Sequence, residues 1–280
     1  MGSPRNQATN IPGLYAIGEC DYQYHGANRL GANSLLSCIF SGLMVAPSIE
    51  NGLKSLAKGS AADLPASLFG NACRQHQERH ENLLKRTGGE NPYLLQQELG
   101  KVMTTAATVV RHNHVMQSAY QKVCELQERA NHCSLSDTGN WSNQNVVFTK
   151  ALIDMFPLAR VILKGAIQRD ESRGAHFKPD FTAAGIQATD PAGKRREAEQ
   201  WCQSFEESTA KWLKTTVAKN ATDGEPIITY EEVDTSLIPP RPRMYGLVGA
   251  EVIEEVWKER HAARQQGGAP AGAKPVLAGA

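Results

Sequence analysis

The stretch that decides the fold reads Gly18-Glu-Cys-Asp-Tyr-Gln-Tyr-His-Gly-Ala-Asn-Arg-Leu-Gly-Ala-Asn-Ser-Leu35. Its three glycines permit backbone conformations that residues with a Cβ avoid, which is typical of a loop. Asn33 or Ser34 can cap the exposed N–H groups of a helix, and apolar residues follow at once. The stretch therefore predicts a loop that leads into a capped, apolar helix.

The flanking residues extend this unit. Pro12-Gly13 is a turn dipeptide, and the apolar run from Leu14 to Ile17 predicts a short buried strand. Pro47 predicts the end of the helix that follows the loop. Apolar residues recur every four positions in that helix and form one stripe: Leu35, Leu36, Ile39, Phe40, Leu43 and Met44.

The same stretch carries groups suited to binding. A carboxylate at a strand end, here Glu19, can accept hydrogen bonds from the hydroxyls of a sugar or polyol. A helix N-terminus offers free N–H donors, and the planar guanidinium of Arg29 can hold a carboxylate with two hydrogen bonds. A nucleotide P-loop is excluded, because Ala32-Asn33 stands where Lys-Ser/Thr is required. A plain glycine turn with a surface arginine and a core helix remains the alternative.

Helical patterns fill the middle of the chain. They span Ser67 to Arg86, then Pro92 to about Ala130 with a break near Arg111 to Asn113, and finally Trp141 to Gln168. Asn91-Pro92 is a cap followed by proline at the first helical position. Long helices with short connections predict a helical bundle. In the last helix five apolar residues lie on or near one face: Val147, Ala151, Met155, Ile162 and Ala166.

Past residue 180 the pattern changes. A charged helix is expected over Pro191 to Ala210, and strands over Trp212 to Ala218 and Pro226 to Val233 predict a hairpin. From about His261 the Ala- and Gly-rich tail predicts disorder. The fold class expected is α+β, mainly α: a residual strand–loop–helix, a helical bundle and a small C-terminal β-hairpin.

Composition bounds the function classes. The chain has 280 residues, a formal net charge of +1, 41% hydrophobic and 21% charged residues, as expected for a globular protein. Such a nearly equal number of positive and negative charges argues against a nucleic-acid partner. No uninterrupted apolar stretch approaches the roughly 18 to 20 residues that span a bilayer. Six scattered cysteines without a CxxC pair predict free, mostly buried thiols and no zinc site.

Several motifs together resemble one known family. Leu14-Tyr-Ala-Ile-Gly-Glu19, followed by His25-Gly-Ala-Asn-Arg-Leu-Gly-Ala-Asn-Ser-Leu35, is similar to the flavoprotein subunit of succinate dehydrogenase and fumarate reductase. Tyr22-Gln-Tyr-His25 resembles bacterial members that work with a di-haem membrane anchor. Glu171-Ser-Arg-Gly-Ala-His176 and Pro239-Pro-Arg-Pro-Arg-Met-Tyr245 resemble the family's C-terminal signature and ending. The resemblance spans roughly residues 4 to 246.

The resemblance implies an FAD cofactor and a role for each matching residue. Glu19 would hydrogen-bond ribityl or ribose hydroxyls of FAD, and Arg29 would bind a carboxylate of succinate or fumarate. Ser34 and Leu35 would meet the N1/C2 carbonyl edge of the flavin at the helix N-terminus. No residue of this chain is assigned as the catalytic proton donor. The fold it implies is the last piece of an FAD-binding domain (1–62), a helical bundle (63–180), a helix with a β-hairpin (181–246), and a helical end with a disordered tail (247–280).

The resemblance also implies partners. The sequence has no GxGxxG dinucleotide fingerprint, no segment with the flavin-attachment histidine and no capping domain, so a missing N-terminal portion of the flavoprotein is expected to supply them. Electrons would pass to an iron–sulfur subunit and then to quinone through a membrane anchor subunit. The complex would sit peripherally on the cytoplasmic face of the bacterial inner membrane.

Two other functions remain open, an L-aspartate oxidase-like flavoenzyme and a non-catalytic helical module that binds a partner. Other candidate residues have simpler interpretations. His76 and His80 fit a solvated helix face better than a metal site, because Gln77 stands where the zinc-protease pattern needs Glu. For Arg173 and His176 a packing or interdomain role is favoured over direct catalysis.

Overall fold

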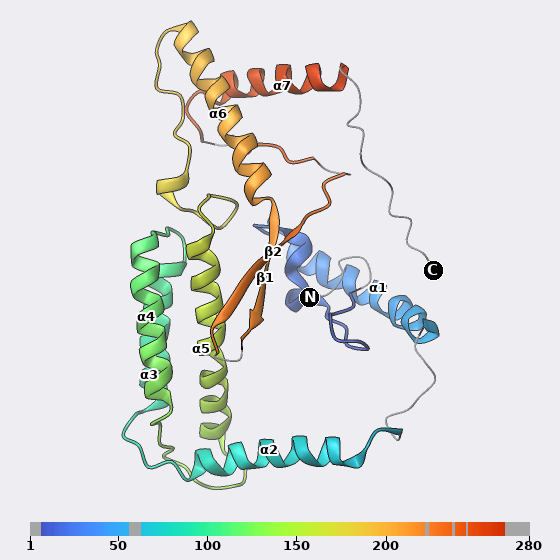
Figure 1. Ribbon diagram of the computed structural model, residues 1–280, viewed down its shortest axis with the longest axis vertical. Helices are drawn as coiled ribbons and strands as arrows, with labels where there is room; N and C mark the ends of the chain where they lie inside the picture. The colour runs from blue at the N-terminus through green and yellow to red at the C-terminus, as the bar shows by residue number, and fades with distance from the viewer. Residues whose placement is uncertain (1–6, 56–62, 222–223, 237–238, 245, 267–280) are drawn as a thin grey trace. The chain divides into compact units, whose positions relative to one another are not determined.

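The computed structural model describes residues 7–55, 63–221, 224–236, 239–244 and 246–266 (Figure 1). It forms two compact units. Unit 1 comprises Met1–Ile167 and Ser172–Pro179, and unit 2 comprises Gln168–Glu171 and Asp180–Ala280. The described elements are mainly helical, with one two-stranded sheet near the C-terminus, so the predicted fold class is confirmed. The division of the chain into four parts stays a prediction.

The N-terminal part of unit 1 contains a 3-10 helix, η1 (Gly18–His25), and the helix α1 (Asn33–Ser55). The short strand predicted over Leu14 to Ile17 is wrong, since only Tyr15 makes an isolated bridge, with Ala8. Strands need a neighbour along several residues, and the chain here offers a single bridging residue. The predicted loop accordingly contains η1.

Helix α1 begins where the capping residues predicted, but Pro47 does not end it. The helix continues to Ser55 with Pro47 inside. A proline inside a helix removes one hydrogen bond, that to the carbonyl four residues earlier. Here that residue is Leu43, which is 72% exposed, so water can bond to the carbonyl instead.

The apolar stripe of α1 is exposed. Leu35, Leu36 and Ile39 are each more than 60% exposed, and the rest of the stripe is exposed too. The segment Asn33–Lys54 is long and apolar enough, by length and composition alone, to cross a membrane, and 6% of it is buried. The sequence analysis expected no such segment, because Gly, Ser and Pro interrupt the apolar run even though its average is high.

The rest of unit 1 is the expected bundle. Its helices are α2 (Ala66–Leu84), α3 (Pro92–Ala107), α4 (Asn113–Ala130) and α5 (Gln144–Gln168). The predicted cap is present, since Asn91 Oδ1 accepts a hydrogen bond of 2.9 Å from the Tyr93 amide. The predicted break near residue 111 separates α3 from α4.

One apolar core joins α3, α4 and α5, which stand side by side in Figure 1. It centres on Leu95, Met116, Val123 and Phe156, all without solvent exposure. The face predicted for α5 is wrong. Of its residues only Ala166 is buried, whereas the neighbouring face supplies the core: Val146, Thr149, Leu152, Phe156, Ala159, Leu163 and Ala166. Helix α5 is apolar on two faces, so the sequence did not distinguish them.

Unit 2 packs α6 (Pro191–Trp212) against α7 (Ala250–Gln266), with a one-turn η3 (Pro179–Phe181) before them. Its core contains Cys202, Ile253 and Trp257. The hairpin is confirmed as β1 (Lys214–Asn220) and β2 (Pro226–Glu232), antiparallel with Val217 opposite Thr229. Because α7 extends to Gln266, disorder from His261 is wrong for its first residues, and residues 267–280 lie outside the described part.

The cysteines are less buried than predicted. Cys133 and Cys202 are buried, and burial raises the pKa of both thiols. Cys20, Cys38 and Cys73 are exposed. Two of these three lie on η1 and α1, where much of the apolar surface is uncovered.

A charged cluster links α3 to α4. Arg129 donates two hydrogen bonds to the carboxylate of Glu90, at 2.8 and 3.0 Å, and two to Glu98, at 2.9 and 3.2 Å. These bonds hold the pKa of both carboxyl groups below the usual value. Carboxylates with a lowered folded-state pKa stabilise the fold above their unfolded pKa of about 4.3, and that contribution is lost as the pH falls through the folded pKa.

We therefore expect Arg129→Gln to lower the thermal midpoint at pH 7 by more than it does at pH 3.5. Circular dichroism melts of both proteins across this range measure the difference. Arg74→Gln is the control, since Arg74 makes an exposed i,i+4 pair at 3.9 Å. A gap between Arg129→Gln and the parent that stays constant from pH 7 to pH 3.5 would contradict the assignment.

In unit 2, Arg169 organises the start of the hairpin. Its Nε lies 2.6 Å from Oε1 of Glu171, whose side chain is fully buried. Its Nη1 donates to the Lys214 carbonyl and to Thr216 Oγ1, at 2.9 and 2.8 Å. The guanidinium also lies over the ring of Trp212. Within unit 2, one side chain thus ties residues 168–171 to β1.

Replacing Arg169 by Met should destabilise unit 2 by about 3 kcal/mol, because it leaves a buried carboxylate without this partner. Urea unfolding followed by tryptophan fluorescence measures the loss. The matched control is Arg195→Met, which removes an ion pair about half exposed on both sides and should cost no more than about 1 kcal/mol. Equal losses for the two variants would count against this role of Arg169.

Candidate functional site

The loop from Gly26 to Ala32 is a defined structure between η1 and α1. Gly26 and Ala32 both have a φ of 65°, in the left-handed region. The amide of Asn33 donates to the Leu30 carbonyl at 3.3 Å, which closes a turn just before α1. The loop is therefore bounded at both ends by left-handed backbone, which a residue with a Cβ such as Ala32 rarely adopts.

Arg29 lies in the middle of this loop and is exposed. Its Nη1 donates to the neighbouring Leu30 carbonyl at 3.3 Å. A guanidinium has five N–H donors in a planar fork, so this bond leaves donors that can hold a carboxylate. The position of Arg29 thus depends mainly on the backbone of the loop.

Ser34 and Leu35 occupy the first turn of α1 and are exposed, Leu35 by 74%. The first N–H groups of a helix have no partner within it, and the helix dipole adds partial positive charge there. An anionic or electron-rich edge of a ligand would suit this end of α1. The flavin position predicted here stays a prediction.

Glu19 lies in the first turn of η1 and is exposed. Helix η1 packs beside the start of α1, since His25 Nε2 lies 3.0 Å from Ser37 Oγ. A Cβ at Gly18 would lie 3.5 Å from Cys38 Sγ. Glu19 is therefore on an element that contacts the first turns of α1. Within the described residues, Glu19, Arg29, Ser34 and Leu35 make no hydrogen bond or ion pair with one another.

The donor set fits FAD. An exposed carboxylate suits a polyol hydroxyl, an exposed helix N-terminus suits the carbonyl edge of a flavin ring, and both belong to two elements in contact. Glu19, Ser34 and Leu35 are all exposed, so a ligand could reach these groups from solvent.

The structure also places the segment Arg173–His176 against this loop. The amide of Ala175 donates to the carbonyl of Ala27 at 3.1 Å. A packing or interdomain role was predicted for Arg173 and His176, which flank Gly174 and Ala175, but the sequence did not indicate their contact partner. The signal available was Gly174, whose φ of 58° and close contact with Ala27 require glycine.

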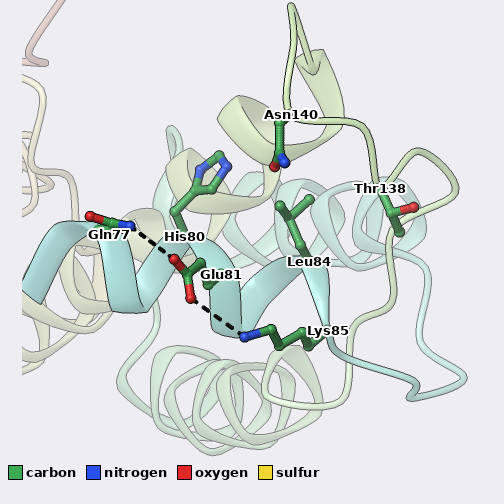
Figure 2. Close-up of a pocket in the computed structure, with 7 residues that line it drawn as sticks. All are labelled: Gln77, His80, Glu81, Leu84, Lys85, Thr138 and Asn140. Atoms are coloured by element: carbon green, nitrogen blue, oxygen red, sulfur yellow. Dashed lines mark hydrogen bonds and ion pairs between the residues drawn. The ribbon is translucent and has the colours of Figure 1, made fainter. Parts of the chain in front are cut away.

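A surface hollow of about 530 Å³ lies elsewhere, between α2 and the segment before α5 (Figure 2). In it Glu81 accepts hydrogen bonds from Gln77 and Lys85, at 3.0 and 3.4 Å, as the dashed lines of Figure 2 show. These polar groups satisfy one another, and the hollow contains none of the predicted site residues. His80 lines it, with Nδ1 3.3 Å from Lys150 Nζ. No group of three or more His, Cys, Asp or Glu side chains in the described part of the chain could hold a metal ion.

Comparison with known proteins agrees with the motifs. The family model for the fumarate reductase flavoprotein C-terminus matches residues 96–245, and an FAD binding domain model matches residues 1–35. The chain is 43% identical over 245 residues to the succinate dehydrogenase flavoprotein subunit of Bacillus subtilis, a match covering 86% of this chain and 37% of that protein.

Solved structures give the same result. The structure of E. coli quinol fumarate reductase superimposes with a TM-score of 0.67 at 29% identity, over 86% of this chain and 37% of that chain. Quinol-fumarate reductase with menaquinol molecules superimposes with a TM-score of 0.65 at 28% identity, over 84% and 37%. The first family model covers more than half of the chain, so the chain belongs to the succinate dehydrogenase and fumarate reductase flavoprotein family. It spans little more than a third of the length of these relatives.

Proposed function

We propose that this chain forms part of an FAD-dependent succinate dehydrogenase or fumarate reductase. The observation that carries the proposal is the loop and helix start at residues 26–35, which presents an arginine and free helix N–H groups at the end of a segment matched by an FAD binding domain model. The relatives are named as succinate dehydrogenase and fumarate reductase flavoprotein subunits. Their names favour this function over an L-aspartate oxidase and over a non-catalytic helical module.

In the proposed reaction each site residue has one task. Arg29 pairs with a carboxylate of succinate or fumarate and fixes its orientation. Glu19 accepts hydrogen bonds from hydroxyls of FAD. The N–H groups at Ser34 and Leu35 stabilise negative charge that develops on the ring edge they face. When bound, FAD supplies the hydride acceptor.

We infer that the exposed stripe of α1 is covered by the part of a family flavoprotein that this chain does not match. A stripe of six large apolar side chains left in water is unusual for a folded protein. The chain matches only 37% of its relatives' length, so a large part of the family's protein is available to cover it. The apolar side of the stripe begins at Leu35, next to the proposed flavin edge.

A membrane span is a poorer explanation for α1. A Cβ on Gly52 would lie 2.2 Å from Tyr15 Oη, and Gly18 approaches Cys38, so the segment of residues 15–18 contacts α1 both near its start and near its end. That segment leads into the charged residues of η1. Lipid on all sides of α1 would require this segment to enter the bilayer or detach.

The remaining partners follow from the same family. We propose an iron–sulfur subunit that accepts the electrons and a membrane anchor subunit that passes them to quinone, with the complex on the cytoplasmic face of the membrane. A solved relative contains menaquinol, which supports quinone as the electron partner of the assembly.

The test uses the assembly isolated from source cells through a tag on this chain. We expect it to contain flavin and to reduce an artificial electron acceptor when succinate is added. Arg29→Gln should lower this activity about 10²- to 10³-fold, since one lost charge-stabilising donor costs about that much in comparable sites. Flavin content should not change, because Arg29 serves the substrate.

The matched control is Lys54→Gln, which removes an exposed cation at the other end of α1 and should leave both readouts unchanged. An assembly without flavin would refute the proposed cofactor. Full succinate activity in Arg29→Gln would refute the substrate role.

A further inference from the structure

The segment Arg173–His176 forms a tight turn. The Arg173 amide donates to the His176 carbonyl at 2.8 Å, and the His176 amide donates back to the Arg173 carbonyl at 3.0 Å. This pair of bonds leaves the amide of Ala175 at the tip, where it donates to the Ala27 carbonyl at 3.1 Å. The turn therefore holds the Gly26–Ala32 loop by a backbone hydrogen bond between residues nearly 150 positions apart in the sequence.

Gly174 brings the two backbones together. Its φ is 58°, and a Cβ there would lie 2.6 Å from the carbonyl oxygen of Ala27 and 2.7 Å from its carbonyl carbon. Those are backbone atoms, which cannot rotate away as a flexible side chain can. Any side chain at residue 174 must displace Ala27 or the turn.

Arg111 fixes the turn to the bundle. Its Nε and Nη2 donate to the Ala107 carbonyl at the end of α3, at 3.0 and 2.8 Å, and its Nη1 lies 2.7 Å from His176 Nδ1. Its backbone amide donates to the Phe177 carbonyl at 2.9 Å. One residue thus connects the end of a core helix to both backbone and side chain of the turn.

The Arg111–His176 contact fixes the role of one ring nitrogen. A guanidinium only donates, so Nδ1 of His176 is the acceptor in this contact. The contact needs an acceptor at the Nδ1 position, and this requirement separates substitutions of His176 that retain an acceptor from those that do not.

We propose that the Arg173–His176 turn, fixed by Arg111, is the positioning element of the substrate-binding arginine. The inference rests on the proposed function, because it assigns Arg29 to a dicarboxylate. Ala27 lies two residues before Arg29, whose own bond reaches only the adjacent Leu30 carbonyl. The turn therefore determines where the Arg29 guanidinium points, and Gly174, Arg111 and His176 are positioning residues for substrate affinity.

The central experiment compares Gly174→Ala with Gly224→Ala in the isolated assembly. Both glycines have positive φ, 58° and 78°, but a Cβ on Gly224 meets nothing within 4 Å. The pair separates the cost of the backbone conformation from the displacement of Ala27. Two readouts are taken: deuterium uptake of peptides covering residues 25–36, and KM and kcat for succinate.

We expect Gly174→Ala to speed deuterium uptake in residues 25–36 and to raise KM for succinate about tenfold or more, with flavin content retained. Gly224→Ala should match the parent in both. His176→Phe, which has no acceptor, should raise KM, and His176→Asn, which places an amide oxygen near the Nδ1 position, should restore most of the loss.

The outcomes distinguish the positioning role of the turn from the proposed function of the chain. Unchanged deuterium uptake in Gly174→Ala would overturn the positioning role even if the assembly proved to have another activity. Faster uptake with an unchanged KM would show that the contact exists but does not govern Arg29, which also overturns it. A parent assembly that exchanges as expected yet does not use succinate would refute the proposed function and, with it, the assignment of Arg29.

Discussion

The hydrogen bonds of the Arg111 guanidinium are the interaction on which the proposed site at residues 26–35 depends. Its donors are divided between the last carbonyl of α3 and the ring of His176, so one rigid group joins a packed core to a surface turn. Burial lowers the pKa of Arg111, as expected when a charge leaves water, and the hydrogen bonds offset that cost. The cation also lies at the C-terminal end of a helix, where the dipole favours it. In this proposal the packed helices of the bundle set the position of the Gly26–Ala32 loop.

Surface coverage is the second constraint. Helices α1 and α5 each carry an apolar face that the described chain leaves exposed. On α5 the uncovered residues include Val147, Met155 and Leu158. Burying apolar surface contributes roughly 25 cal/mol per Å², so two uncovered stripes forgo a large stabilisation. Both observations have one explanation if these faces pack against the parts of the flavoprotein that this chain does not match.

The sequence predicted the elements whose causes are local. Asn91 and the break near Arg111 fixed the ends of helices, because caps and polar breaks act over a few residues. It failed where the cause is remote or two local patterns compete. Pro47 was tolerated because its cost falls on an exposed turn, and the core face of α5 could not be chosen while both faces were apolar. The site residues were predicted from a resemblance of motifs and stay a prediction, whereas the contact of Gly174 with Ala27 joins segments that no periodicity connects.

In the proposed function, the exposure of Arg29 limits its affinity for a dicarboxylate. Two unit charges 4 Å apart attract by about 1 kcal/mol in bulk water and by about 4 kcal/mol at an effective dielectric constant of 20. An arginine open to solvent is thus a weak dicarboxylate ligand. The same arginine becomes selective once a second structure excludes water from the loop. The bundle and its turn fix the guanidinium in advance, so covering it need not reorganise it, and the added attraction goes to the substrate. Substrate affinity and the covering of α1 should therefore arise together.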